Sequence, residues 1–178
     1  DGECFIRTAT GGGKAYMRCL TDKAKAGFGR FYKDDSSTAS SYVFAGCYST
    51  GLNMSGKQIY FSGTNWGLQN RIGGAYPAFT LGLANWPGIA PYPQQWLTWG
   101  FSHTWTSPSS GTTTQLMLNG LINTATVASA SSGTLDTGGG VCISGRASDT
   151  ARDWTGATSF LMFWDRPLSD EELLSLNS

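Results

Sequence analysis

The sequence lacks acidic residues throughout its central part. No Asp or Glu occurs between positions 36 and 135, and the cations of this stretch are Lys57 and Arg71. Charged residues make up 13% of the 178 residues, well below the usual share of about 25%. We expect either a β-sheet surface that needs no charge or a surface that meets a neutral polar partner, such as a sugar or another copy of the chain.

Other absences exclude whole classes of function. The twelve Lys and Arg residues balance the twelve Asp and Glu residues, so neither a nucleic acid nor an anionic membrane surface is predicted as a partner. No run reaches the ~18 apolar residues of a membrane span, and no signal-peptide pattern is present, so no membrane insertion is predicted. The chain starts with Asp1 rather than Met, which indicates a piece of a longer product.

The four cysteines match no zinc or redox spacing, because none of them forms a Cys-x-x-Cys pair. A hairpin of residues 3–10 and 13–20 with Thr10 opposite Gly13 places Cys4 opposite Cys19, and a shift of one residue removes that match. The alternatives are therefore a Cys4–Cys19 disulfide and thiols buried as small hydrophobic groups.

Glycine and aromatic residues are abundant, with 24 Gly and 13% aromatics. This composition favours many short strands joined by tight turns. Asn119-Gly120 between apolar runs is a strong hairpin signal. A helix is expected only at the end, where Ser169 precedes three acidic residues and a leucine-rich turn. The predicted strands cover residues 4–10, 15–20, 28–33, 41–48, 58–62, 77–83, 95–105, 114–118, 121–127, 140–145 and 157–164.

The C-terminal half carries a recognisable series of motifs. It comprises a Trp-led strand at 95–101, the Asn-Gly hairpin at 116–121, a strand ending in Gly-Arg at 142–146, Trp-Thr-Gly at 154–156, and Asp-Arg-Pro-Leu-Ser-Asp-Glu-Glu-Leu at 165–173. Over residues 94–176 this series resembles the laminin G-like and pentraxin-like branch of the concanavalin A-like lectin/glucanase superfamily. One departure is Ala157-Thr158-Ser159, where the family usually has Ile-Asp, so a carboxylate often found there is missing.

The resemblance implies the fold. We expect an all-β protein, namely an antiparallel two-sheet jelly-roll sandwich of the concanavalin A-like type with one short C-terminal helix. Residues 1–178 are expected to form a single domain, because their number suits one domain with a sizeable core.

Catalysis is not predicted, although the superfamily includes glucanases. Glycoside hydrolysis generally needs two carboxylates about 5–9 Å apart, and the glucanases of this type carry theirs on one central strand, where this chain has none. The single histidine, His103, has Trp99, Phe101 and Trp105 as strand neighbours, so a partly buried sheet histidine is expected. The sequence therefore predicts that the protein is not an enzyme.

Calcium is a weaker prediction than the fold. The resemblance allows it, because relatives bind calcium with loop oxygens. The candidate ligands are Asp149, Asp153 and Asp136 with Asn123. This set is smaller than a usual cluster of carboxylates, so the prediction contains no cofactor and no committed metal site.

Aromatic residues within polar loops are the candidate binding site. Sugar rings pack their apolar faces on Trp and Tyr, while amide, Arg and Asp side chains bond the hydroxyls. Trp66, Trp86 and Tyr92 are expected to be exposed, for ligand binding or alternatively for loop packing or a subunit contact. The predicted ligand-binding residues are Asn65, Trp66, Arg71, Asn85, Trp86, Tyr92, Asp149, Arg152 and Trp154. Most of the remaining tryptophans, Trp96, Trp99, Trp105 and Trp164, are expected to be core anchors.

The sequence thus supports two functional hypotheses. The first is a non-catalytic, lectin-like binding module that recognises glycans or a cell- or virion-surface protein, on an extracellular or virion-surface protein. The second is a structural decoration, coat or fibre subunit whose weakly charged sheets mediate self-assembly.

Overall fold

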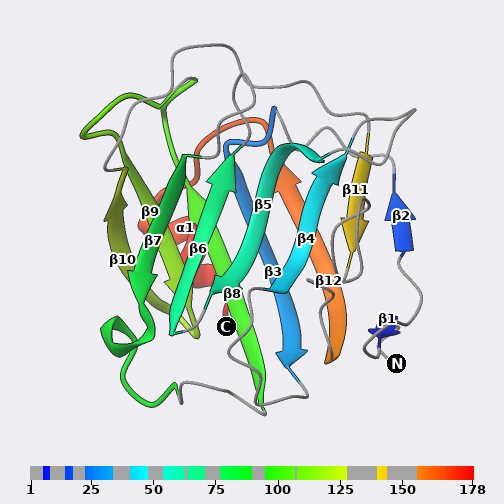
Figure 1. The fold of residues 1–178 in the computed structure, drawn as a ribbon. Coiled ribbons are helices and arrows are strands. Elements are labelled where there is room, and N and C mark those ends of the chain that lie inside the picture. The colour runs from blue at the N-terminus through cyan, green and yellow to red at the C-terminus, as the bar shows by residue number, and fades with distance from the viewer. Residues whose placement is uncertain are drawn as a thin grey trace.

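The computed structural model describes residues 6–8, 15–17, 23–33, 41–47, 54–62, 64–70, 77–89, 95–106, 108–127, 140–143 and 156–178. They form two antiparallel six-stranded sheets that lie face to face (Figure 1). Sheet 1 has the order β1–β12–β3–β8–β9–β10, with the bounds Ile6–Thr8, Gly156–Trp164, Ala26–Lys33, Trp96–Ser102, Thr113–Leu118 and Leu121–Thr126. Sheet 2 has the order β2–β11–β4–β5–β6–β7, with the bounds Ala15–Met17, Gly140–Ile143, Ser41–Cys47, Met54–Ser62, Asn65–Asn70 and Ala78–Gly82. The predicted all-β architecture of two antiparallel sheets is confirmed.

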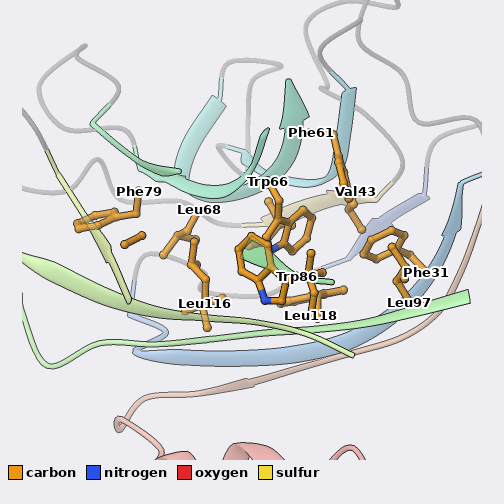
Figure 2. Packing of buried hydrophobic residues seen from close by; sticks show 14 of the residues in the cluster. Phe31, Val43, Phe61, Trp66, Leu68, Phe79, Trp86, Leu97, Leu116 and Leu118 are labelled. Atoms are coloured by element: carbon orange, nitrogen blue, oxygen red, sulfur yellow. The ribbon is translucent and has the colours of Figure 1, made fainter. Parts of the chain in front are cut away.

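The core lies between the two sheets, as Figure 2 shows. Trp66, Trp86 and Trp99 are among its largest fully buried side chains. The ring of Trp66 lies 5.6 Å from that of Phe31 and 4.7 Å from that of Phe61, measured between centroids, so it joins β6 to both sheets. Large aromatic side chains dominate the burial of apolar surface, and three tryptophans therefore account for much of this core.

Aromatic rings at every second residue, from Trp99 and Phe101 in β8 to His103 and Trp105 just beyond its end, form one row. Trp99 and Phe101 are stacked with centroids 6.3 Å apart, and Phe101 stacks on His103 at 6.1 Å. His103 in turn stacks on Trp105 at 3.6 Å. A strand sends alternate side chains to one face, which places Trp99 and Phe101 on the inner side of sheet 1. His103 and Trp105 continue the row of stacked rings beyond the end of β8. The predicted core position of Trp99 is confirmed, since Trp99 is fully buried. His103 was expected to be a partly buried strand residue; it lies just after β8 and is almost completely buried.

A glycine in β3 makes room for this row of rings. A Cβ at Gly29 would lie 2.7 Å from the indole ring of Trp99 and 2.6 Å from the carbonyl oxygen of Phe160. Both neighbours belong to packed strands, and one of them is backbone, so neither gives way easily. Gly29 therefore sets how closely β3 approaches β8 and β12.

The C-terminal helix α1 (Asp170–Ser175) packs outside sheet 1. The Ser169 hydroxyl accepts a hydrogen bond from the backbone N–H of Glu172, and the Glu172 carboxylate accepts one from the backbone N–H of Ser169. Leu173 is buried in a second, smaller cluster with Phe28 and Met117. The predicted cap is confirmed. Of the three leucines Leu173, Leu174 and Leu176 that were expected to pack onto the sandwich, Leu173 and Leu176 do so, whereas Leu174 is exposed.

The predicted hairpin is confirmed at β9 and β10. Leu118 pairs with Leu121, and Asn119 and Gly120 at the turn have φ angles of 47° and 76°. A two-residue turn of this kind needs a positive φ at both positions, which Asn and Gly tolerate.

The predicted hairpin of residues 3–10 and 13–20 is wrong. Strand β1 pairs with β12 in sheet 1, whereas β2 pairs with β11 in sheet 2, so the two strands do not face each other. The geometric reason for a Cys4–Cys19 disulfide is therefore lost, and both cysteines lie outside the described residues. Cys142 is buried in β11, which agrees with the alternative of a buried thiol.

Candidate functional site

Two of the predicted sugar-stacking residues lie in the core. Trp66 is 0% exposed and Trp86 is 1% exposed, so the prediction that they are exposed is wrong. Trp66 belongs to β6, where pairing with β5 and β7 turns Trp66 and Leu68 inward. Trp86 follows the short 3₁₀ helix η1 (Leu83–Asn85), and its Nε1 donates to the carbonyl of Leu121 at 2.8 Å. In these positions neither indole offers a face to a ligand, which leaves the packing alternative.

Two of the predicted amide residues do lie together at the surface. Asn65 and Asn85 are exposed, and both side chains lie beside Gly82. A Cβ added to Gly82 would lie 3.8 Å from Asn65 Oδ1 and 3.9 Å from Asn85 Nδ2. Asn85 Nδ2 donates to the carbonyl of Gly82 at 2.8 Å, and Asn123 Nδ2 donates to the carbonyl of Asn85 at 3.1 Å. The structure thus gathers these polar groups without the aromatic partners that were predicted for them.

The other predicted binding residues fall outside the described residues. They are Arg71, Tyr92, Asp149, Arg152 and Trp154, and their role stays a prediction. The same holds for Asp136 and Asp153 of the predicted calcium ligands. Within the described ranges, no group of three His, Cys, Asp or Glu is placed to hold a metal ion.

An open depression of about 360 Å³ lies on the outer face of sheet 1, beside the end of α1. We call it the Trp96 groove. All of its lining residues are described, and they come from β3, β8, β12, the β9–β10 turn and the C-terminal segment. They are Phe28, Arg30, Trp96, Thr98, Asn119, Phe160, Leu176, Asn177 and Ser178.

Strand register brings the central residues of the groove together. Arg30 of β3 is directly opposite Thr98 of β8, and Tyr32 is directly opposite Trp96. Side chains on one face of an antiparallel pair touch both their direct and their diagonal neighbours. Arg30 is thereby placed beside Trp96, although 65 residues separate them in the chain.

The groove contains a guanidinium group stacked on an indole. Arg30 Cζ lies 5.0 Å from the ring centroid of Trp96, and the Tyr32 ring lies 5.8 Å from the same indole. Such a stack is attractive and also holds the guanidinium in a fixed orientation. Phe28 and Phe160, whose ring centroids are 5.7 Å apart, add apolar surface.

Thr98 fixes the polar side of the groove. Its backbone N–H donates to Asn119 Oδ1 at 3.0 Å, and its hydroxyl donates to Asn177 Oδ1. The backbone N–H of Asn119 donates to the carbonyl of Thr98 at 2.9 Å. The β9–β10 turn and the C-terminal segment are therefore both tied to the middle of β8.

The sequence interpretation missed this groove because it assigned Trp96 to the core. Trp96 is in fact half-buried on the outer face, whereas its neighbours Leu97 and Trp99 are fully buried. A signal was present, since Trp96 and Thr98 alternate with Leu97 and Trp99 in the period of a two-faced strand. Only the pairing with Arg30, which long-range register decides, is not readable from local sequence.

A second group of polar residues, His103 just after β8 and Lys57 of β5, is buried beside Trp105, but its environment suits no catalyst. Burial and, as the next cause, the charge of Lys57 lower the pKa of His103 to about 3. His103 Nδ1 lies 3.0 Å from the carbonyl of Trp105, to which it donates as a neutral ring. Lys57 is 1% exposed, with its Nζ 5.5 Å from the Trp105 ring. A neutral, enclosed imidazole of this kind has a structural role.

No helix among the described residues has the length and apolar character to cross a membrane. No family model and no curated protein matches the chain. Solved structures do match it. A native heptameric SAP-like pentraxin from Limulus polyphemus aligns over 98% of this chain and 74% of its own, with 16% identity and a TM-score of 0.61.

Two other structural neighbours are similar in the same degree. The CBM40 of Ruminococcus gnavus IT-sialidase aligns over 89% of this chain and 86% of its own, with 15% identity and a TM-score of 0.60. The binding domain of botulinum neurotoxin serotype D aligns over 97% of this chain but 42% of its own, with 10% identity and a TM-score of 0.67. These matches show that the fold is a concanavalin A-like sandwich, as predicted.

Proposed function

We propose that this protein is a non-catalytic, lectin-like binding module that recognises glycans or a glycan-bearing surface partner through the Trp96 groove. The observation that carries the proposal is the composition of the groove. An indole, a guanidinium stacked on it and two asparagine side chains share one open depression. We further propose that the module is part of an extracellular or virion-surface protein.

The groove offers both kinds of contact that a sugar needs. The C–H faces of a pyranose ring pack on aromatic side chains, and its hydroxyls bond amide and guanidinium groups. Trp96, Phe28 and Phe160 supply the first kind, while Arg30 and the asparagines supply the second. Because β3, β8 and the Thr98 hydrogen bonds hold these groups, little ordering is needed on binding.

The structural neighbours support the proposal at the level of fold. One structure of the Ruminococcus gnavus CBM40 holds α2,3-sialyllactose, and the botulinum neurotoxin neighbour is named a binding domain. A shared fold does not by itself transfer a ligand, so the proposal rests on the groove. The fold also includes glucanases. Since no lining residue has a carboxylate side chain, the groove lacks the acid pair of a glycosidase.

A glycan array with the purified protein tests the proposal. We expect binding to one group of glycans, and about tenfold weaker binding by Trp96→Ala, because the variant loses the stacking surface. The matched control is Met162→Ala, which removes a side chain that is 37% exposed on β12 and does not line the groove. Met162→Ala should bind like the parent.

Two results would contradict the proposal. An array without any bound glycan would exclude the lectin function. Parental affinity of Trp96→Ala, measured on a variant whose circular dichroism shows the native fold, would place the ligand outside the groove.

One observation favours the second hypothesis, a structural subunit. Strand β10 is an edge of sheet 1, and its residues Leu121–Thr126 carry no charge. Leu121, the first residue of the strand, is 46% exposed. Edge strands usually carry a charge or a proline that prevents pairing with another chain. The absence of a charge and of a proline in β10 therefore supports self-association, which is compatible with glycan binding on the outer face of sheet 1.

A further inference from the structure

We infer that the core binds one or two ordered water molecules, which bridge the Asn70 side chain and His103 Nε2 beside Lys57. This internal site is separate from the Trp96 groove, because none of its residues lines that groove. It is therefore independent of the proposed function. Three features support it, namely the gathering of buried polar side chains, the atoms left without a partner there, and the hydrogen bonds that those atoms can make.

Two polar side chains of sheet 2 are buried side by side. Lys57 of β5 pairs directly with Asn70 at the end of β6, and the two residues are 1% and 0% exposed. Directly opposite residues of an antiparallel pair carry their side chains on the same face. Leu68, two residues before Asn70, lies in the core between the sheets, so Asn70 and Lys57 face that core as well.

His103 and Trp105, which follow β8 of sheet 1, meet this pair from the other side of the core. Lys57 Nζ lies 5.5 Å from the ring centroid of Trp105, and the His103 ring stacks on the same indole at 3.6 Å. The charge of Lys57 is also the second cause of the lowered pKa of His103. Phe79 of β7 stacks on Trp105 at 5.3 Å, so groups from both sheets enclose one polar centre.

Three polar atoms of this centre lack a partner within the described part of the chain. They are Asn70 Oδ1, Asn70 Nδ2 and His103 Nε2, although Asn70 is fully buried and His103 is 4% exposed. A buried polar group without a hydrogen bond lowers stability, and native proteins satisfy nearly all such groups with protein atoms or ordered water. Three such atoms in one cluster therefore point to a bound molecule.

The hydrogen-bonding roles of the three atoms identify that molecule as water. His103 Nδ1 donates to the carbonyl of Trp105 at 3.0 Å, so Nε2 of the neutral ring is an acceptor. Asn70 Oδ1 is a second acceptor, whereas Asn70 Nδ2 is a donor. A molecule that satisfies all three atoms must both donate and accept, as water does. An anion only accepts hydrogen bonds, and a metal cation is repelled by the Lys57 ammonium.

Such a bridge joins the two sheets through their polar centre. Asn70 belongs to sheet 2, whereas His103 follows the last residue of β8 in sheet 1. Buried waters typically make about three hydrogen bonds to otherwise unsatisfied groups and are costly to remove. The water is therefore part of the folded structure and fixes the orientation of the Asn70 amide.

Crystallography and NMR spectroscopy of the whole chain test the inference. A crystal structure that shows ordered water should have electron density within hydrogen-bond distance of the Asn70 amide and of His103 Nε2, directly or through a second water. In solution, the His103 ring protons should give nuclear Overhauser cross-peaks to water with the sign of a long-lived contact, because an enclosed water tumbles with the protein. A bromide soak separates water from an anion, since bromide gives an anomalous signal.

A variant at one end of the bridge shows whether the polar centre holds the water. Asn70→Leu replaces the amide with an apolar side chain and should lose both the density and the water cross-peaks of the His103 ring. The control is Thr158→Val, which removes another buried hydroxyl that lacks a partner among the described residues. Thr158 pairs with Phe31 late in β3, whereas the His103 N–H donates to Lys25 before β3 begins, so the control should keep both signals.

Several outcomes would overturn the inference. Density for water beside neither side chain, or beside only one of them, excludes the bridge. An anomalous bromide peak in the polar centre assigns the site to an anion instead. Water cross-peaks of the His103 ring that persist in a folded Asn70→Leu place the water elsewhere. If Asn70→Leu does not fold, His103→Phe tests the other end, where unchanged water cross-peaks of the Asn70 amide protons contradict the bridge and their loss supports it.

Discussion

His103 is the only histidine of the chain, and its ring is enclosed by aromatic side chains. It stacks between Phe101 and Trp105, and burial followed by the charge of Lys57 lowers its pKa from 6.5 to about 3, with a smaller contribution from Lys25. In the unfolded chain the imidazole takes up a proton near pH 6.5. Between these values the unfolded state binds more protons than the native state, so stability falls as the pH falls from about 6.5 to about 3.

We therefore expect the free energy of unfolding to be about 2 kcal/mol lower at pH 5 than at pH 7, because protonation of one unfolded histidine competes with folding. Urea denaturation at a series of pH values measures it. His103→Phe, which keeps a ring in the stack, should remove most of this dependence whatever its stability at pH 7. An equally steep dependence in the variant would assign the effect to other groups.

Helix α1 is an element whose stability depends on a few exposed groups. The Glu172 carboxylate accepts hydrogen bonds from the Arg166 side chain and from the Ser169 backbone N–H, and these lower the pKa of Glu172 to about 2. Because the folded pKa lies below the ordinary value of 4.5, this contribution is complete above about pH 4.5 and is lost as the pH falls toward 2. The segment that follows the same helix supplies Leu176 and Asn177 to the Trp96 groove.

Loss of the cap should therefore weaken both the helix and the groove. We expect Ser169→Ala to lower the free energy of unfolding by about 1 kcal/mol, the usual cost of removing an N-cap hydroxyl. Amide hydrogen exchange in residues 170–178 should become faster, and glycan affinity should fall. The control is Ser175→Ala, whose hydroxyl donates to the carbonyl of Glu172 outside the cap. An unchanged rate of amide hydrogen exchange in Ser169→Ala would contradict a role of the cap in holding residues 170–178 against the groove.

Elements with local signals could be predicted from the sequence. The β9–β10 hairpin needs only Asn119 and Gly120 at positive φ, and α1 needs only the Ser169 cap and leucines at helical spacing. The two-sheet fold followed from the strand pattern together with the resemblance of the C-terminal half. In each case the residues that decide the structure are neighbours in the chain.

The candidate site could not be predicted in the same way. The polar context of Trp66 suggested a loop, yet pairing of β6 with two neighbouring strands turns the indole into the core. Conversely, the apolar context of Trp96 suggested a core residue, yet the register with β3 places it on the outer face beside Arg30. Composition describes a segment, whereas strand pairing decides which face each side chain takes.

At the scale of the whole molecule, the neutral central sequence folds into most of both sheets. The strands β4 to β10 lie within residues 36–135, where Lys57 and Arg71 are the charged residues and Lys57 is buried in the core. The described part of this region therefore presents polar but uncharged strands, including the edge strands β7 and β10. Such a surface suits glycan contacts, and its edge strands β7 and β10 lack the charges that oppose pairing with another copy.

If β10 pairs with a second copy, one charge at that edge should prevent it. We expect light scattering of the concentrated protein to show a mass above that of the monomer, and Thr126→Lys to return it to the monomer, because a lysine on an edge strand opposes pairing. Thr113→Lys is the matched control, since Thr113 is exposed and pairs with Thr126 from the inner strand β9. It should keep the parental mass. A monomer at every concentration for the parent would contradict assembly through β10 and leave glycan binding as the function of this surface.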